Sequence, residues 1–113
     1  MYALFLGLKS ISPADLHQLM EAEPITVVDV NPRDRWSQAH VPGATNLDPE
    51  SFRSKDLPAD KSATVVFYCS NFLCSKGPKA AKRAMKLGYR NAMVMSAGIK
   101  GWLGAKLPTQ SDS

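Results

Sequence analysis

The residues of this chain best suited to chemistry are two cysteines, Cys69 and Cys74, and the loop that joins them. The apolar run 65–68 before Cys69 is typical of a buried strand, and the Ala- and Lys-rich segment after Ser75 is typical of a helix. At such a junction the outward-facing amides of a helix N-terminus favour an anion. The spacing therefore places Cys69 where a thiolate, the reactive form of cysteine, can be stabilised.

Two opposing interpretations apply to Cys69. Lys76 and Lys79 favour a reactive role if they lean toward the loop, because cations near a thiol lower its pKa. The helix dipole adds only about 0.3–1 kcal/mol, so it does not decide the ionisation state alone. The alternative is a buried and inert residue, because free cysteine often packs as a small hydrophobe.

Length and composition restrict the class of protein. The chain has 113 residues, 44% hydrophobic and 21% charged, which predicts one folded domain over residues 1–113. The net charge of +4 comes from scattered residues, so we expect no nucleic-acid partner. The apolar start 1–8 is too short to cross a bilayer, so we expect no membrane association. Two cysteines are too few for a secreted disulfide framework, which indicates a cytoplasmic protein.

The sequence also argues against a metal site or a cofactor. Only two histidines, His17 and His40, could join the cysteines as metal ligands, and they are far apart in the sequence. Trp36 and Trp102 are assigned to the core or its edge rather than to a cofactor site. We therefore expect no metal and no cofactor, while the oligomeric state leaves no signal in the sequence.

The elements that must position the loop follow from local pattern. Predicted strands are residues 25–30, 64–68 and 91–95, with a weaker strand signal at 45–47. One predicted helix starts after the N-cap Ser12. Three further helices are predicted at 32–39, 78–87 and 99–105, and a single helical turn at 48–52. Residues 53–62 are expected to form a surface connection and 109–113 a frayed tail. The alternation predicts an α/β three-layer sandwich, with a mainly parallel central sheet and helices on both faces.

Two polar residues are expected to lie near the loop in structural roles. Asp29 interrupts the first predicted strand, where a carboxylate must be hydrogen bonded or do chemistry, and local hydrogen bonding is the commoner case. His40 begins a turn rich in Pro and Gly. In parallel sheets ligands bind beyond the carboxyl ends of the strands, which is where Cys69 would lie. His17 lies off the apolar stripe of its helix and is expected at the surface.

Several motifs together resemble those of the rhodanese domain family. Their order and spacing cover nearly the whole chain, which implies the rhodanese-like fold. The matching segments are Val27-Val28-Asp29-Val30 with Trp36, the turn His40-Val41-Pro42-Gly43-Ala44, Cys69 after an apolar strand, Leu87-Gly88-Tyr89, Gly98-Ile99 with Gly101-Trp102, and Leu107-Pro108.

The resemblance implies sulfur transfer. In that family the loop cysteine takes a sulfane sulfur from a donor, becomes a persulfide, and passes the outer sulfur to a thiol or protein acceptor. Cys69 matches that cysteine. The loop amides would cradle the persulfide, and the residues of this substrate-binding loop are Ser70, Asn71, Phe72, Leu73, Cys74 and Ser75. Related phosphatases carry one more loop residue and end the loop in arginine, and this loop has neither feature.

The loop departs from the family pattern where sulfurtransferases often carry arginine. Ser70 and Cys74 stand at those positions, and Phe72 replaces an intervening glycine. Asn31 replaces a further arginine after the first predicted strand. Because a guanidinium grips an anion through two hydrogen bonds, these changes argue against efficient use of thiosulfate. A positive φ at Phe72 would also be costly, as it would not be at glycine.

Cys74 suggests a second activity of the loop. It could resolve a persulfide or sulfenic form of Cys69 by closing a disulfide, if the two Cα atoms come within about 7 Å. The alternative is that Cys74 merely faces the interior at the helix start. Phe72 and Leu73 either form an apolar docking rim or pack over the sheet, and packing is expected for one of the two.

Three functions are compatible with these observations. The first is a single-domain sulfurtransferase that carries a persulfide on Cys69, with a thiol or protein donor rather than thiosulfate. The second is a catalytically weak module of the same fold, used for partner binding or thiol redox sensing. The third, an arsenate reductase or phosphatase, ranks last because oxyanion chemistry would need the missing arginine.

Overall fold

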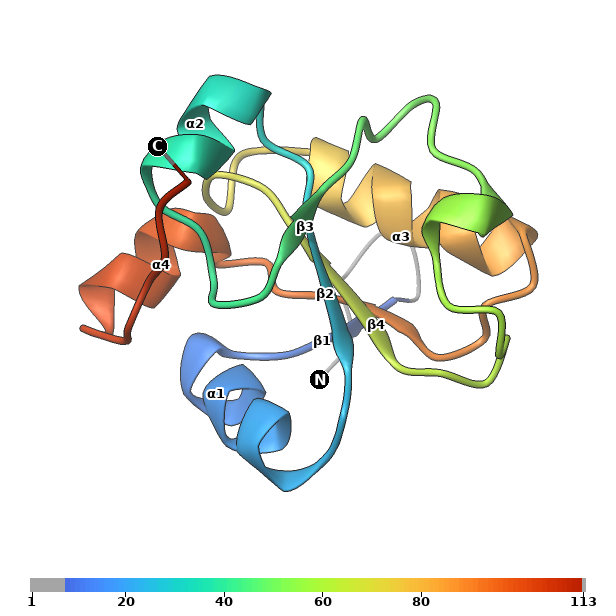
Figure 1. The fold of residues 1–113 in the computed structure, drawn as a ribbon, viewed down its shortest axis with the longest axis horizontal. Coiled ribbons are helices and arrows are strands. Elements are labelled where there is room, and N and C mark those ends of the chain that lie inside the picture. The colour runs from blue at the N-terminus through green and yellow to red at the C-terminus, as the bar shows by residue number, and fades with distance from the viewer. Residues whose placement is uncertain (1–7, 113) are drawn as a thin grey trace.

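The computed structural model describes residues 8–112, which form a five-stranded sheet flanked by helices (Figure 1). The apolar start 1–8 therefore lies outside the described residues, apart from the buried Leu8. Among the described helices, none has the length and hydropathy of a transmembrane span. In chain order the elements are β1 (Lys9–Ser10), α1 (Pro13–Ala22), β2 (Thr26–Asp29), α2 (Arg33–Gln38), β3 (Thr45–Asn46), the 3₁₀ helix η1 (Ser54–Asp56), β4 (Val65–Tyr68), α3 (Lys76–Lys86), β5 (Ala92–Val94) and α4 (Gly98–Gly104).

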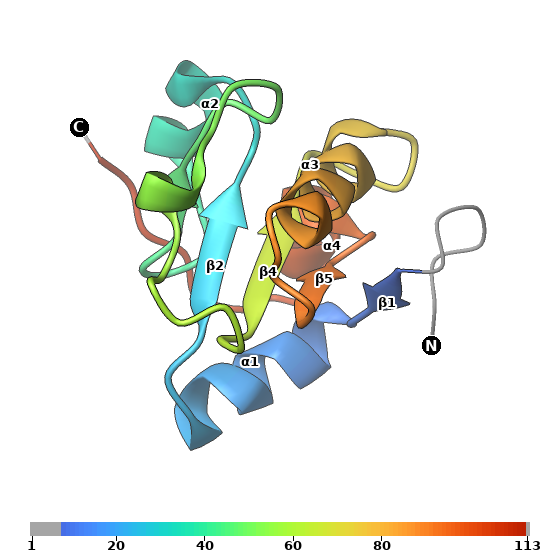
Figure 2. The same ribbon diagram turned by 90° about the vertical axis from the view of Figure 1, so that its right-hand side faces the viewer.

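The sheet is parallel throughout, with strand order β1-β5-β4-β2-β3. The central strands β2 and β4 lie side by side, with Thr26 opposite Val65 and Asp29 opposite Tyr68 (Figure 2). Because parallel strands end at the same edge, the segments that follow Asp29 and Tyr68 meet there. The predicted parallel sheet is confirmed, and this edge carries Cys69.

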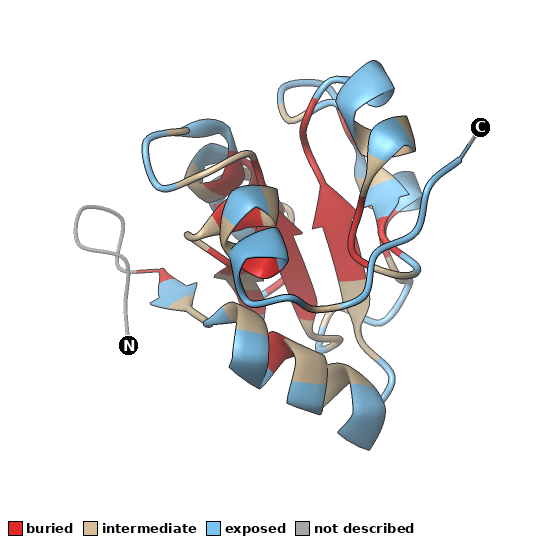
Figure 3. Ribbon diagram, turned by 90° about the vertical axis from the view of Figure 1, so that its left-hand side faces the viewer, coloured by how far each residue is buried: buried red, intermediate tan, exposed pale blue. Residues whose placement is uncertain are grey.

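Alternating side chains of the central strands build one apolar core on each face of the sheet. One core joins Val28 and Phe67 to the alanines of α3. The other joins Val27 and Tyr68 to α1 and to Trp102 of α4. The buried strands therefore lie between helices (Figure 3), which confirms the predicted three-layer sandwich.

Local sequence signals account for most helix boundaries. The hydroxyl of Ser12 accepts the amide of Asp15 at 3.1 Å and caps α1 as predicted. Helix α3 begins at Lys76, two residues earlier than predicted, and Ser75 at its N-cap accepts no hydrogen bond with its side chain. The predicted turn at 48–52 forms, with the amide of Phe52 donating to the carbonyl of Asp48 at 3.2 Å.

Three surface expectations differ from the structure because long-range contacts override local polarity. His17 lies edge-on to Trp102, with ring centroids 5.8 Å apart, so it is half-buried rather than solvated. The connection 53–62 buries Leu57 against the core beneath α3. At the C-terminus, His40 and Gln110 exchange two backbone hydrogen bonds of 2.9 Å, where a frayed tail was expected.

Candidate active site

Cys69 follows β4 directly at the carboxyl edge of the sheet, and only 5% of its surface is exposed. It is joined to Cys74 by a disulfide, with the two Cα atoms 6.2 Å apart. This separation lies within the range that a disulfide spans. The structure therefore brings together the two cysteines that the sequence singled out, in their oxidised state.

The loop 69–75 is anchored by the first residues of α4. The amides of Ile99 and Lys100 donate to the carbonyls of Cys69 and Ser70, each at 3.0 Å. Gly98 has a φ of +67°, and a Cβ at this position would lie 2.5 Å from the carbonyl carbon of Ser70. Only glycine permits this approach, so Gly98 sets the position of the loop. The sequence placed Gly98 in a family motif without indicating this role, because the contact joins residues far apart in the chain.

Within the loop, Asn71 binds two of the amides that were expected to form the cradle. The amide of Leu73 donates to Asn71 Oδ1 at 2.9 Å, and the amide of Cys74 donates to the Asn71 carbonyl at 3.2 Å. In the oxidised loop these amides are therefore directed to Asn71. Among the described non-glycine residues only Lys106 has a positive φ, so the backbone cost considered for Phe72 does not arise.

Asn31, which follows β2, forms a polar wall beside Cys69. Its side chain is buried, and its Oδ1 lies 3.6 Å from Cys69 Sγ. A disulfide sulfur carries no proton, so this contact becomes a hydrogen bond only when Cys69 is a thiol. Asn46 holds the wall in place by donating Nδ2 to the carbonyls of Asp29 and Asn31, at 3.0 and 2.8 Å. No motif in the sequence indicated this role for Asn46.

Asp29 is buried at the end of β2. Its Oδ1 accepts the amide of Asn31 at 2.7 Å, and its Oδ2 has no hydrogen-bond partner among residues 8–112. Burial raises the pKa of Asp29 above its usual value, and the nearby Tyr68 hydroxyl and Asn31 amide act in the opposite direction. Burial also raises the pKa of Tyr68, whose hydroxyl accepts the amide of Val41 at 3.0 Å. The bond to the Asn31 amide is a local hydrogen bond of the kind expected for Asp29, while its structural role stays a prediction.

His40 joins α2, its own turn and the C-terminal residues. Its ring stacks on Trp36 with centroids 4.4 Å apart, and its Nδ1 lies 2.7 Å from the Trp36 carbonyl oxygen. Its backbone pairs with Gln110. The ring is thus held by packing on Trp36, while the structural role of His40 stays a prediction.

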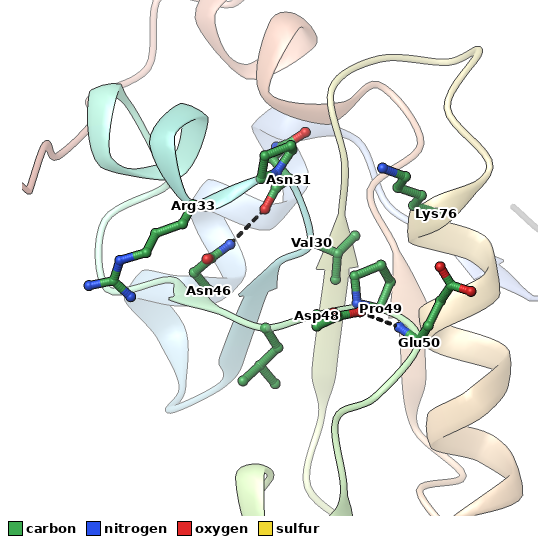
Figure 4. A pocket seen from close by; sticks show the side chains of 10 residues that line it. Val30, Asn31, Arg33, Asn46, Asp48, Pro49, Glu50 and Lys76 are labelled. Carbon is green, nitrogen blue, oxygen red and sulfur yellow. Dashed lines mark hydrogen bonds between the residues drawn. The ribbon is translucent and has the colours of Figure 1, made fainter.

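A pocket of about 380 Å³ lies beside the Asn31 wall, between the ends of β2 and β3 and the start of α3 (Figure 4). Lys76 extends toward it from α3, whereas Lys79, the other lysine expected to lean toward the loop, does not line it. The pocket adjoins Cys69 through Asn31. Its lining consists of Val30, Asn31, Pro32, Arg33, Asn46, Leu47, Asp48, Pro49, Glu50 and Lys76.

The tip of the loop is apolar and solvent-exposed. Phe72 is 76% exposed and Leu73 is 93% exposed. The expectation that one of the two packs over the sheet is therefore wrong. The bond between Cys69 and Cys74 closes the loop and the hydrogen bonds of Asn71 tighten it, which leaves both side chains pointing away from the core.

The arrangement suits thiol chemistry. Reduction of the disulfide would yield a shielded sulfur at Cys69 with a second thiol, Cys74, close enough to re-form the bond. The loop 69–75 itself contains no cationic side chain, and Lys76 is the first residue after it that carries one. An anionic ligand would therefore find cationic side chains only outside the loop.

Comparison with curated proteins places these features in context. The chain is 28% identical to the thiosulfate sulfurtransferase GlpE of Haemophilus influenzae, over 91% of this chain and 95% of that protein. It is 32% identical to the HTH-type transcriptional regulator Rv0324 of Mycobacterium tuberculosis, over 88% of this chain. The matched part is only 43% of that regulator, so the chain spans less than half of its length.

Solved structures and the family pattern agree on the fold. The BH2092 protein of Bacillus halodurans superposes with a TM-score of 0.83 at 24% identity, covering 91% of this chain and 77% of that one. Residues 12–105 match the family described as rhodanese-like domain, and this match includes Asp29, His40 and both cysteines. This chain therefore belongs to the rhodanese-like domain family.

Proposed function

We propose that this chain is a sulfurtransferase that carries a persulfide on Cys69. The observation that carries the proposal is the position of Cys69, which lies at the carboxyl edge of a parallel sheet and is joined to Cys74. Membership of the rhodanese-like family supports the reaction class. The similarity to a protein named thiosulfate sulfurtransferase, over nearly the full length of both chains, supports it further.

The proposed reaction has two exchange steps without net oxidation. The Cys69 thiolate first attacks the outer sulfur of a donor persulfide. A new S–S bond forms on Cys69, the S–S bond of the donor breaks, and the donor leaves as a thiolate. An acceptor thiolate then attacks the outer sulfur on Cys69, and Cys69 leaves as a thiolate.

The Cys69 persulfide can also react with Cys74. Its thiolate attacks the inner sulfur of the Cys69 persulfide, closes the Cys69–Cys74 disulfide and releases hydrosulfide. A dithiol reductant then restores both thiols and is itself oxidised to a disulfide. The separation of 6.2 Å between the Cα atoms supports this resolving role.

We propose a thiol-derived or protein-bound sulfane donor in preference to thiosulfate. Thiosulfate is a small dianion, and the loop has Ser70 and Cys74 where arginine would bind such an anion. The same absence argues against phosphatase or arsenate reductase chemistry. A cytoplasmic location, which would supply both thiols and reductants, stays a prediction.

A second candidate is a catalytically weak module for partner binding or thiol redox sensing. Two observations favour it: Cys69 is engaged in a disulfide, and Phe72 and Leu73 present exposed apolar side chains beside it. In this function the state of the disulfide would control a partner, and no sulfur would be transferred.

Mass spectrometry of the reduced protein separates the two candidates. The protein is incubated with glutathione persulfide, a protein persulfide or thiosulfate, and the mass is measured before and after addition of an acceptor thiol. We expect a gain of one sulfur atom that is transient in wild type and stable in Cys74→Ser, and no gain in Cys69→Ser. Thiosulfate should be the poorest donor of the three.

The resolving role is tested in the same samples. Persulfidated wild type should release sulfide and form the Cys69–Cys74 disulfide, whereas Cys74→Ser should retain its sulfur until an acceptor is added. If no donor adds sulfur to Cys69, the sulfurtransferase proposal is wrong. A disulfide that still forms readily with mild peroxide would then favour redox sensing.

A further inference from the structure

The pocket beside Asn31 contains charges of both signs (Figure 4). Lys76 reaches it from α3, and Arg33 lines it from the start of α2. Asp48 and Glu50 contribute carboxylates from the segment after β3. The formal charges of these four side chains cancel, so the pocket is polar without favouring one sign.

Two of these four charged groups are engaged: the Arg33 guanidinium lies over the Trp36 ring, and Asp48 Oδ1 accepts the Glu50 amide. Among the residues drawn in Figure 4, the hydrogen bonds join Asn46 to Asn31 and the Glu50 amide to Asp48 Oδ1, at 2.8 and 2.9 Å. The Lys76 ammonium and the Glu50 carboxylate take no part in either bond. Both side chains are exposed at the rim of the pocket.

The composition of the pocket selects among small ligands. An inorganic dianion would be attracted by Lys76 and Arg33 and repelled by Asp48 and Glu50, with no net gain. A ligand with only a positive charge would meet the opposite conflict. A zwitterion can place each of its charges against a side chain of opposite sign, and a pocket of about 380 Å³ is large enough for a small amino acid.

We propose that this pocket binds a small amino-acid thiol, with its carboxylate at Lys76 and its ammonium group at Asp48 and Glu50, as the acceptor of sulfur from Cys69. The proposal rests on the persulfide function proposed above. Asn31 lines the pocket and also contacts Cys69 Sγ at 3.6 Å, which connects the binding site to the reacting sulfur.

The transfer is a balanced exchange. The thiolate of the bound amino acid attacks the outer sulfur of the Cys69 persulfide, and a new S–S bond forms on the ligand. The bond between the outer sulfur and Cys69 Sγ breaks, and its electron pair remains on Cys69 as a thiolate. The thiol proton of the ligand passes to solvent, and no oxidant or reductant is needed.

Binding can be measured without any sulfur chemistry by using thioethers. The probes are S-methylcysteine, 3-(methylthio)propionate, which lacks the ammonium group, and 2-(methylthio)ethylamine, which lacks the carboxylate. Amide chemical shifts of Asn31, Glu50 and Lys76 in the reduced protein report occupancy. We expect S-methylcysteine to bind about fivefold more tightly than either singly charged probe, since each loses one charge contact.

Two variants test which side chain binds the carboxylate of the ligand and which binds its ammonium group. Lys76→Met should weaken the carboxylate-bearing probes about fivefold and leave 2-(methylthio)ethylamine unchanged. Glu50→Gln should weaken the ammonium-bearing probes and leave 3-(methylthio)propionate unchanged. Lys82→Met, on the exposed side of α3 and outside the pocket, is the matched control and should bind all three probes as wild type does.

Transfer is then measured in persulfidated Cys74→Ser, where Cys74 cannot consume the persulfide, with cysteine, cysteamine or 3-mercaptopropionate as acceptor. Each rate with a pocket variant added is divided by the rate of Cys74→Ser alone for the same thiol, which removes differences in intrinsic nucleophilicity. Lys76→Met should lower the ratio for cysteine and 3-mercaptopropionate, which carry a carboxylate. Glu50→Gln should lower the ratio for cysteine and cysteamine, which carry an ammonium group. Equal binding of the three thioethers, or no effect of Lys76→Met and Glu50→Gln, would overturn the pocket assignment. A protein that binds S-methylcysteine selectively but never gains sulfur on Cys69 would instead overturn the sulfurtransferase function and the acceptor role, and would leave only the binding site.

Discussion

At the scale of single residues, Asp29 couples the stability of the fold to pH. Burial raises its pKa above the usual 3.8, so the folded protein retains a proton that the unfolded chain releases. Where the folded state binds more protons, the free energy of unfolding decreases as pH rises. The contribution of Asp29 is therefore fully present below its unfolded pKa and is lost as pH rises through its raised folded pKa.

We expect Asp29→Asn to remove this pH dependence. Asparagine keeps an oxygen for the Asn31 amide, which lies 2.7 Å from Asp29 Oδ1, but carries no charge into the core. The free energy of unfolding of wild type minus that of Asp29→Asn, from urea titrations, should fall as pH rises from about 4 toward neutrality. A difference that stays constant or rises would contradict the assignment.

Asp60→Asn provides a control of opposite sign. Hydrogen bonds from Ser62 lower the pKa of Asp60, so its contribution is present above the unfolded pKa and is lost as pH falls through the lowered one. The free energy of unfolding of wild type minus that of Asp60→Asn should therefore rise with pH. Two carboxylates in one chain thus report opposite environments, one buried and one exposed with local donors.

At the scale of elements, the start of α4 is a support for the cysteine loop. Gly98→Ala would place a Cβ against the Ser70 carbonyl and would force alanine into a φ of +67°. We expect it to destabilise the protein by about 2–4 kcal/mol, from backbone strain and overpacking together. Disulfide formation between Cys69 and Cys74 should also slow, because the amides of α4 no longer hold the loop in place.

Urea unfolding and the rate of thiol loss under mild oxidation measure these two effects. Gly104→Ala is the matched control, because it also lies in α4 and a Cβ there meets no atom within 4 Å. This control should be neutral or slightly stabilising, since alanine is a better helix former than glycine. Equal behaviour of the two variants would show that the loop does not depend on the close approach at Gly98.

At the scale of the whole molecule, the C-terminal residues close the side of the sandwich that carries the His40 turn. Gln110 exchanges two backbone hydrogen bonds with His40, and its side chain accepts the Gly43 amide at 2.8 Å. The amide of Asp112 donates to the carbonyl of Ser37 at 2.8 Å. These bonds connect α2 and the turn 40–44 to the end of the chain.

A chain that stops after Pro108 should therefore be less stable by about 1–3 kcal/mol, the expected value for a few partly exposed hydrogen bonds. Amide hydrogen exchange should become faster at His40 and Gly43. Exchange in the central strands should change only as much as the overall free energy of unfolding does. A chain that stops after Asp112 is the control and should match wild type. Unchanged protection at His40 in the shorter chain would show that the tail contributes nothing.

The order of the elements was predictable because it is encoded locally. The runs of β-branched residues before Asp29 and Cys69 predicted β2 and β4, and the Ser12 cap predicted the start of α1. The proximity of Cys69 and Cys74 could be stated only as a condition on their distance, which the fold then met at 6.2 Å.

Taken by itself, the sequence determined the α/β class, the parallel sheet and a cysteine loop at its carboxyl edge. These features depend on residue type and short-range periodicity, which any stretch of chain expresses without knowledge of its neighbours. Only the tertiary structure decided that Gly98 seats the loop, that Phe72 and Leu73 are exposed, and that Gln110 pairs with His40. The roles of Gly98 and Gln110 depend on contacts between segments distant in sequence, and the exposure of Phe72 and Leu73 depends on the absence of such contacts. Local sequence carries no signal of either.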